Sequence, residues 1–99
     1  MNQEFVIVKC DVYCDWEDKP PKYRVFVNEE LFGERTYIWQ HQYLEEIIQI
    51  FAPPGNYDIK YQLVPPSRGE LKIKNIRIVD GPANSTIHQN QLRLAHAST

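Results

Sequence analysis

The chain has 99 residues, of which 42% are hydrophobic and 24% charged, and its formal net charge is -2. A chain of this length forms one domain, residues 1–99, around a single core. Its nearly balanced charge gives no electrostatic reason to expect a nucleic-acid partner or an anionic membrane. The start has no basic, apolar leader, and no apolar run approaches the ~20 residues of a membrane helix. We therefore expect a protein of the cytosol, or of a particle assembled there.

The first strand is predicted over residues 5–14, and its opening residues are apolar on both faces, which favours a central place in a sheet. One face carries Val6, Val8, Cys10, Val12 and Cys14. The two cysteines would lie roughly 13 Å apart along a strand, too far for a disulfide. No second close pair of Cys or His completes four metal ligands. We expect two reduced, buried thiols and no bound metal.

A hairpin is predicted next. Residues 23–27 form its first strand, and Asn28-Glu29 suits a tight turn because Asn tolerates positive φ. The chain would return through Leu31-Phe32. Gly33 allows a bulge or bend, and the β-branched and aromatic stretch 36–39 predicts a further strand segment.

Residues 41–51 fit two structures. Four apolar residues recur at helical spacing, namely Leu44, Ile47, Ile48 and Phe51. A strand would instead place the odd-numbered residues 43–51 on one face and the even-numbered residues on the other. The segment has no N-cap residue and lies among strands, so a strand is favoured and a helix is left open.

The clearest strand follows the turn signal Pro53-Pro54-Gly55. Tyr57, Ile59, Tyr61 and Leu63 alternate with Asp58, Lys60 and Gln62. Strict alternation of this kind is typical of an antiparallel sheet with one buried face and one face in water.

The last third of the chain predicts two more strands. Residues 71–79 change phase near Lys74-Asn75, and one extra residue there, a β-bulge, would restore a common face. Turn residues 80–85 lead to a final short strand near Ile87 and 92–94. The whole chain is thus predicted to contain seven or eight short strands. This pattern predicts an all-β, antiparallel, jelly-roll-like β-sandwich.

Catalytic chemistry has little support in the sequence. Glu45 and Glu46 would point to opposite faces of a strand, so they cannot act together as acid and base. A Cys10 or Cys14 nucleophile with His41 or His88 stays open, although no spacing favours it. The acidic loop before Pro20 lacks the EF-hand pattern for calcium. We predict a non-enzymatic protein without a cofactor.

Aromatic residues carry the candidate binding sites. For a protein partner, the predicted anchors are Trp16, Phe32, Tyr37 and Trp39, and the predicted rim contacts are Glu29, Glu30 and Arg35. Trp16 lies in a polar loop, where an exposed tryptophan indicates an interface. The alternative is a carbohydrate-stacking platform built from Trp39, Tyr37, Tyr43 and His41. A third possibility is that Tyr37 or Trp39 simply fills the core.

Strand edges are a further possible binding site. The proline-rich loops at residues 20–21, 53–54 and 65–66 are typical of edges that are protected from pairing. An assembly protein still needs only one open edge to accept a strand from another chain.

One long stretch carries a resemblance. PKYRVFVNEELFGERTYIW at 21–39 continues into YLEE at 43–46, PGNY at 54–57 and LKIKN at 71–75. Together these segments, within residues 20–80, resemble small uncharacterised proteins of tailed, contractile-tail phages of marine cyanobacteria. The resemblance implies a viral origin and a structural or host-interaction role, in the virion or the host cytoplasm. The implied partners are virion or host proteins or a second copy, with a glycan as the alternative. No activity and no site residue follow from it.

Overall fold

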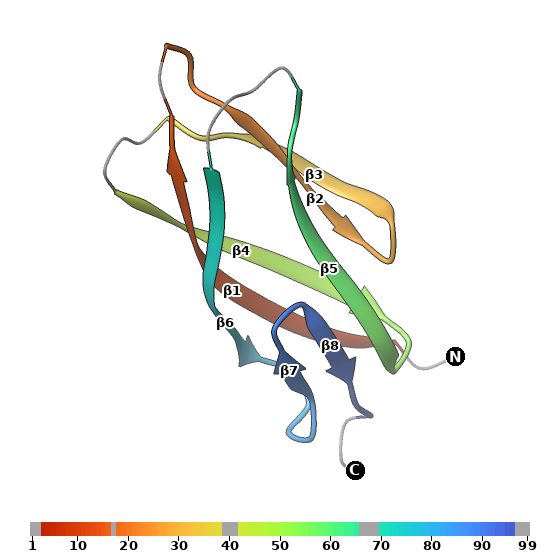
Figure 1. Ribbon diagram of the computed structural model, residues 1–99. Helices are drawn as coiled ribbons and strands as arrows, with labels where there is room; N and C mark the ends of the chain where they lie inside the picture. Colours follow the sequence, from red (N-terminus) through yellow and green to blue (C-terminus); the bar gives the residue numbers. More distant parts are fainter. Residues whose placement is uncertain (1–2, 17, 39–41, 66–69, 97–99) are drawn as a thin grey trace.

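The structure is a computed structural model that describes residues 3–16, 18–38, 42–65 and 70–96. All of its regular elements are strands (Figure 1), which confirms the all-β prediction. They are β1 (Glu4–Asp15), β2 (Lys22–Val27), β3 (Glu30–Thr36), β4 (Tyr43–Ala52), β5 (Gly55–Leu63), β6 (Glu70–Asp80), β7 (Thr86–His88) and β8 (Gln91–Leu94). Residues 43–52 form a strand, so the favoured structure of this segment is confirmed and the helical alternative is wrong.

The strands form two antiparallel sheets that face each other as a sandwich. One sheet has the order β4-β1-β6, and the other has the order β3-β2-β5-β8-β7. β1 is central in its sheet, as its apolar start predicts. The molecule is elongated, with extents of 52 × 23 × 17 Å. The finer, jelly-roll-like arrangement stays a prediction.

The core lies between the two sheets and follows the predicted alternation. The inward face of β1 is buried along its whole length, at Val6, Val8, Cys10, Val12 and Cys14. Tyr57, Ile59, Tyr61 and Leu63 of β5 face the same core, while the residues between them are exposed. Both cysteines are free and buried, as predicted. Branched and aromatic side chains suit these positions because they fill a pleated, buried surface.

Bulges adjust the phase of the edge strands β6 and β3. β6 shifts its register against β1 between Lys9 and Asp11, where Asn75 adopts a positive φ of 55°. The apolar residues on both sides of Asn75 therefore reach the core, which confirms the predicted bulge. In β3, Val25 pairs with Gly33 and Phe26 with Leu31, so that Phe32 is the extra residue.

The strand predicted over 36–39 has the wrong bounds. β3 runs without interruption from Glu30 to Thr36, because the bulge beside Gly33 is absorbed within one strand. After Thr36 the backbone N–H of Tyr37 donates a hydrogen bond to the carbonyl of Pro21 at 2.8 Å, and the Tyr37 side chain enters the core. Trp39 lies outside the described residues.

Candidate functional site

A groove with both apolar and polar lining residues opens on the side of the sandwich where β3 and β4 lie. It has a volume of about 380 Å³ and lies between the β2–β3 hairpin and the end of β4. We call it the hairpin groove, and its main apolar lining residues are Val27, Leu31, Phe32, Ile50, Phe51 and Tyr57. Leu31 is 59% exposed, Phe32 41% and Phe51 63%. Large apolar side chains that gather in this way usually mark an interaction site.

The hairpin that forms one wall of the groove is held in place by its turn. Asn28 and Glu29 have φ values of 50° and 69°, the two consecutive positive values of a two-residue type I′ turn. The backbone N–H of Asn28 donates to the carbonyl of Asp58 at 2.8 Å. The backbone N–H of Asp58 donates to the Asn28 side-chain oxygen at 2.7 Å. This reciprocal pair fixes the hairpin to β5, so Leu31 and Phe32 are displayed on a rigid element.

Farther along β4 from the groove, a carboxylate is buried between the sheets. Glu46 of β4 points inward and is 5% exposed. Its Oε1 accepts a hydrogen bond from the Tyr23 hydroxyl at 2.7 Å and lies 3.3 Å from Nε of Arg35. β2, β3 and β4 are thereby joined across the two layers. A buried charge needs such partners, because an unpaired carboxylate in the core is strongly destabilising.

A second polar contact joins the two sheets, where Cys10 of β1 meets Tyr61 of β5. The Cys10 thiol donates a hydrogen bond to the Tyr61 hydroxyl at 3.2 Å. Burial is the main cause that raises the pKa of Cys10 to about 11. It also raises the pKa of Tyr61 and of Tyr23, and for Tyr23 the hydrogen bond to Glu46 adds to the effect. At neutral pH the Cys10 thiol is protonated, so it is a poor nucleophile.

Replacing Tyr23 with Phe tests the buried carboxylate. We expect Tyr23→Phe to lower the free energy of unfolding by about 1–3 kcal/mol, because it leaves Glu46 without its buried donor. Tyr57→Phe is the matched control, since its hydroxyl donates to the Pro53 carbonyl at an exposed site and should change stability by about 0.5 kcal/mol or less. Urea unfolding of both variants measures the difference. Equal losses of unfolding free energy in the two variants would contradict the view that Glu46 depends on its buried hydrogen bond from Tyr23.

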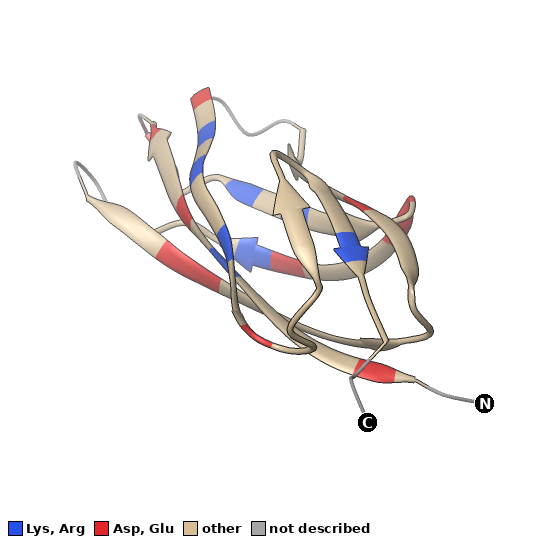
Figure 2. Cartoon of the chain, turned by 90° about the horizontal axis from the view of Figure 1, so that it is seen from below, with Lys and Arg blue, Asp and Glu red and all other residues tan. Residues whose placement is uncertain are grey.

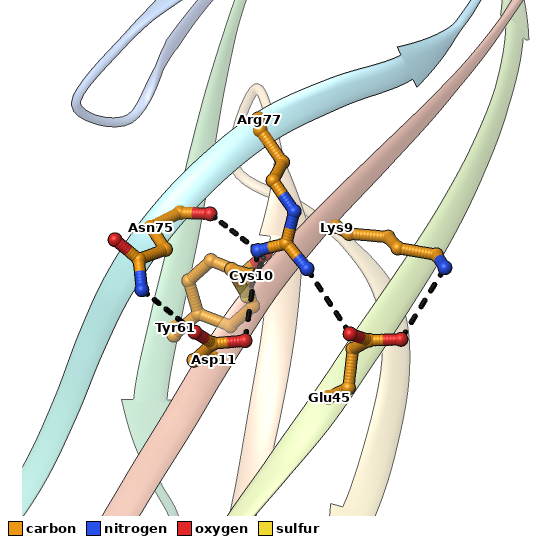
Figure 3. Close-up of polar contacts among 7 residues, drawn as sticks. All are labelled: Lys9, Cys10, Asp11, Glu45, Tyr61, Asn75 and Arg77. Atoms are coloured by element: carbon orange, nitrogen blue, oxygen red, sulfur yellow. Dashed lines mark hydrogen bonds and ion pairs between the residues drawn. The ribbon is translucent and has the colours of Figure 1, made fainter.

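The outer face of the three-stranded sheet carries a network of charges across β4, β1 and β6 (Figures 2 and 3). Arg77 of β6 contacts Glu45 at 3.0 Å and Asp11 at 3.5 Å. Lys9 approaches the other oxygen of Glu45 at 3.3 Å, and the Asn75 side-chain amide donates to Asp11 at 2.8 Å. Glu45 and Glu46 point to opposite faces, as the strand alternation predicts. Asp11 and Glu45 are both paired with cations, so this network serves to link the three strands.

The hairpin groove unites some of the predicted site residues. Phe32 and Glu30 line it, and Glu29 is exposed at the adjoining turn. Arg35, predicted as a rim contact, is held by the buried Glu46. Tyr43 is exposed at the far end of β4, where its ring centroid lies 5.5 Å from that of Tyr13.

Two of the predicted aromatic anchors have a different environment. Tyr37 is fully buried, so its prediction as a surface anchor or a sugar-stacking residue is wrong, and the core alternative holds. Trp16 is half-buried and packs against the core, because it directly follows β1. It is therefore not the exposed loop tryptophan that the sequence indicates. Trp39 and His41 lie outside the described residues.

Besides Phe32, the large exposed apolar residues of the groove are Leu31 and Phe51, and neither of them was predicted as a site residue from the sequence, nor was the burial of Glu46. A signal for Phe51 was present, because the strand alternation places it on the same face as Glu45, opposite Glu46. The positions of Leu31 and Glu46 depend on neighbouring strands. The bulge at Phe32 sets the direction of Leu31, and Arg35 together with Tyr23 makes the burial of Glu46 possible.

The described part of the chain offers no cluster of three or more His, Cys, Asp or Glu side chains that would hold a metal ion. Within it, no helix is long and apolar enough to cross a membrane. No protein-family model matches the chain, and neither the curated proteins nor the solved structures contain a significant match.

Proposed function

We propose that the chain is a non-enzymatic protein-interaction module whose partner docks on the hairpin groove. The observation that carries this proposal is the exposure of Leu31, Phe32 and Phe51 around one groove. Apolar side chains of this size in a shallow cavity are suited to anchoring a partner, while the neighbouring Glu29 and Glu30 supply a polar rim. The rigid hairpin favours binding because little ordering entropy is lost.

A small virion or accessory structural protein of a phage is the specific form of this function that we propose. Its support is the resemblance within residues 20–80, together with a groove suited to a protein surface. A carbohydrate site is the weaker candidate, because the burial of Tyr37 removes one of its stacking residues.

The groove is tested by Leu31→Ser and Phe51→Ser in affinity capture from the cells in which the protein is made. We expect each variant to weaken capture of the specific partner at least about tenfold, the effect of losing about 1.4 kcal/mol. Val79→Ser is the matched control, because Val79 is a similarly exposed apolar residue outside the groove. Equal capture by all three variants would argue against the proposal.

A further inference from the structure

The four edge strands of the two sheets, β3, β4, β6 and β7, differ in how well they are protected against pairing with a strand of another chain. β3 contains the bulge at Phe32, β6 shifts its register against β1 at two places, and β7 has only three residues. These features discourage pairing with another chain. β4 has none of them: it pairs with β1 over ten consecutive residues without a register shift, and it contains no Pro or Gly. Among the described strands, β4 therefore presents the long, regular edge that is open to another strand.

We propose that β4 pairs antiparallel with β4 of a second copy, with the two-fold axis at Ile47. The inference goes beyond the proposed function, because it assigns the β4 edge a partner of its own, a second copy of the chain. The outward row of β4 is Tyr43, Glu45, Ile47, Gln49 and Phe51, all exposed. About that axis, Tyr43 lies opposite Phe51, Glu45 opposite Gln49, and Ile47 opposite its own copy. Aromatic and aliphatic pairs of this kind stabilise a sheet, and no like charges are directly opposed.

Two other registers that keep an outward residue on the axis are less favourable. A two-fold axis at Glu45 would place two carboxylates directly opposite each other. An axis at Gln49 would leave Tyr43 and Glu45 beyond the end of the partner strand, because β4 ends at Ala52. The inward charge of Glu46 does not oppose pairing, since Tyr23 and Arg35 satisfy it within the chain.

The pairing would join two three-stranded sheets into one continuous sheet over residues 43–51, along about 31 Å of edge at ~3.4 Å per residue. It is an isologous contact, in which the same surface of each copy meets itself and the assembly closes as a dimer. It also accounts for the exposure of Ile47, which is 44% in the single chain. In the dimer, cross-strand neighbours cover this side chain.

The mass in solution tests the proposal. In light scattering coupled to size exclusion, we expect the wild-type chain to reach twice its 11.7 kDa at high micromolar concentration. Ile47→Lys should give the monomer mass at the same concentration, because two ammonium groups would meet at the axis. Val79→Lys is the matched control, an aliphatic side chain of 46% exposure on β6, and should remain dimeric. A wild-type monomer at the highest concentration, or a dimer that Ile47→Lys leaves intact, would overturn the inference.

Cross-linking tests the register of the β4–β4 pairing. It also tests the pairing itself if Ile47→Lys fails to fold. Directly opposed Cα atoms lie ~4.5–5.5 Å apart, within the range of a disulfide. Ile47→Cys should therefore form a covalent dimer under mild oxidation. Gln49→Cys should not, because its two Cα atoms would lie about 14 Å apart. The opposite result would rule out the axis at Ile47. A monomeric wild-type chain whose capture of a partner is weakened by Leu31→Ser would leave the proposed function standing. A dimeric wild-type chain whose capture is unchanged by Leu31→Ser would refute that function alone.

Discussion

Ile48→Ala should destabilise the fold by about 2–5 kcal/mol, while Ile47→Ala should change stability by about 0.5 kcal/mol or less. The two residues are neighbours in β4 and chemically identical. Ile48 is fully buried opposite Val8 of β1, whereas Ile47 faces outward opposite Lys9. Truncation at Ile48 leaves a cavity in the core, and truncation at Ile47 leaves none. Urea unfolding at low protein concentration, where the chain is monomeric, measures both.

This pair of variants also separates the two structures that the sequence allows for residues 43–52. On a helix, Ile47 and Ile48 belong to the same apolar stripe, so both substitutions would be costly. On a strand, adjacent residues point to opposite faces. Similar losses for the two variants would contradict the position of β4 in the sandwich. The structure requires a large loss of unfolding free energy for Ile48→Ala and little or none for Ile47→Ala.

The folded state should lose stability steeply above about pH 9. The core holds acidic protons that the unfolded chain releases, because burial raises the pKa of Cys10 from 9.0 to about 11 and raises the pKa of Tyr23 and Tyr61 above 10.0. Below pH 9.0 these groups are protonated in both states, and their contribution is fully present. As the pH rises, the unfolded state ionises first, so the free energy of unfolding falls. Each group approaches a slope of about 1.4 kcal/mol per pH unit.

Urea unfolding at a series of pH values from about 8 to about 11 measures this loss, to which Cys10 alone contributes roughly 3 kcal/mol across its shift. Cys10→Ser keeps a hydrogen-bond donor toward Tyr61 and removes the titrating thiol. Its stability should therefore fall less steeply between pH 9.0 and about 11. A wild-type stability that stays level over this range, or an unchanged slope in the variant, would show that these protons are not held by the fold.

The strands could be predicted from the sequence wherever apolar and polar residues alternate strictly. The inward face of β1, both faces of β5 and the bulge near Asn75 follow from which residues are apolar. The predictions fail where a position depends on another strand. Tyr37 follows a strand in a polar-looking stretch and enters the core because its backbone is bound to Pro21. No local pattern shows this contact.

The candidate site was predicted only in part for the same reason. The turn at Asn28-Glu29 and the aromatic Phe32 are visible in the sequence. The groove exists because the hairpin and the end of β4 meet in space, with Phe32 and Phe51 on opposite walls. The charge of Glu46 gives no sign of burial until Tyr23 and Arg35 are brought beside it by two other strands.

The three-stranded sheet has a consequence for how the chain is synthesised. Both ladders of β1 join it to strands that are made much later, β4 at Tyr43–Ala52 and β6 at Glu70–Asp80. The β2–β3 hairpin can close locally, but β1 cannot complete its sheet until β6 has left the ribosome. Pairing between such distant segments is slow, since a long loop must be closed before any contact forms. During that interval the twelve-residue β1 is an unpaired apolar strand, so newly made chains depend on rapid completion or on a chaperone to avoid aggregation.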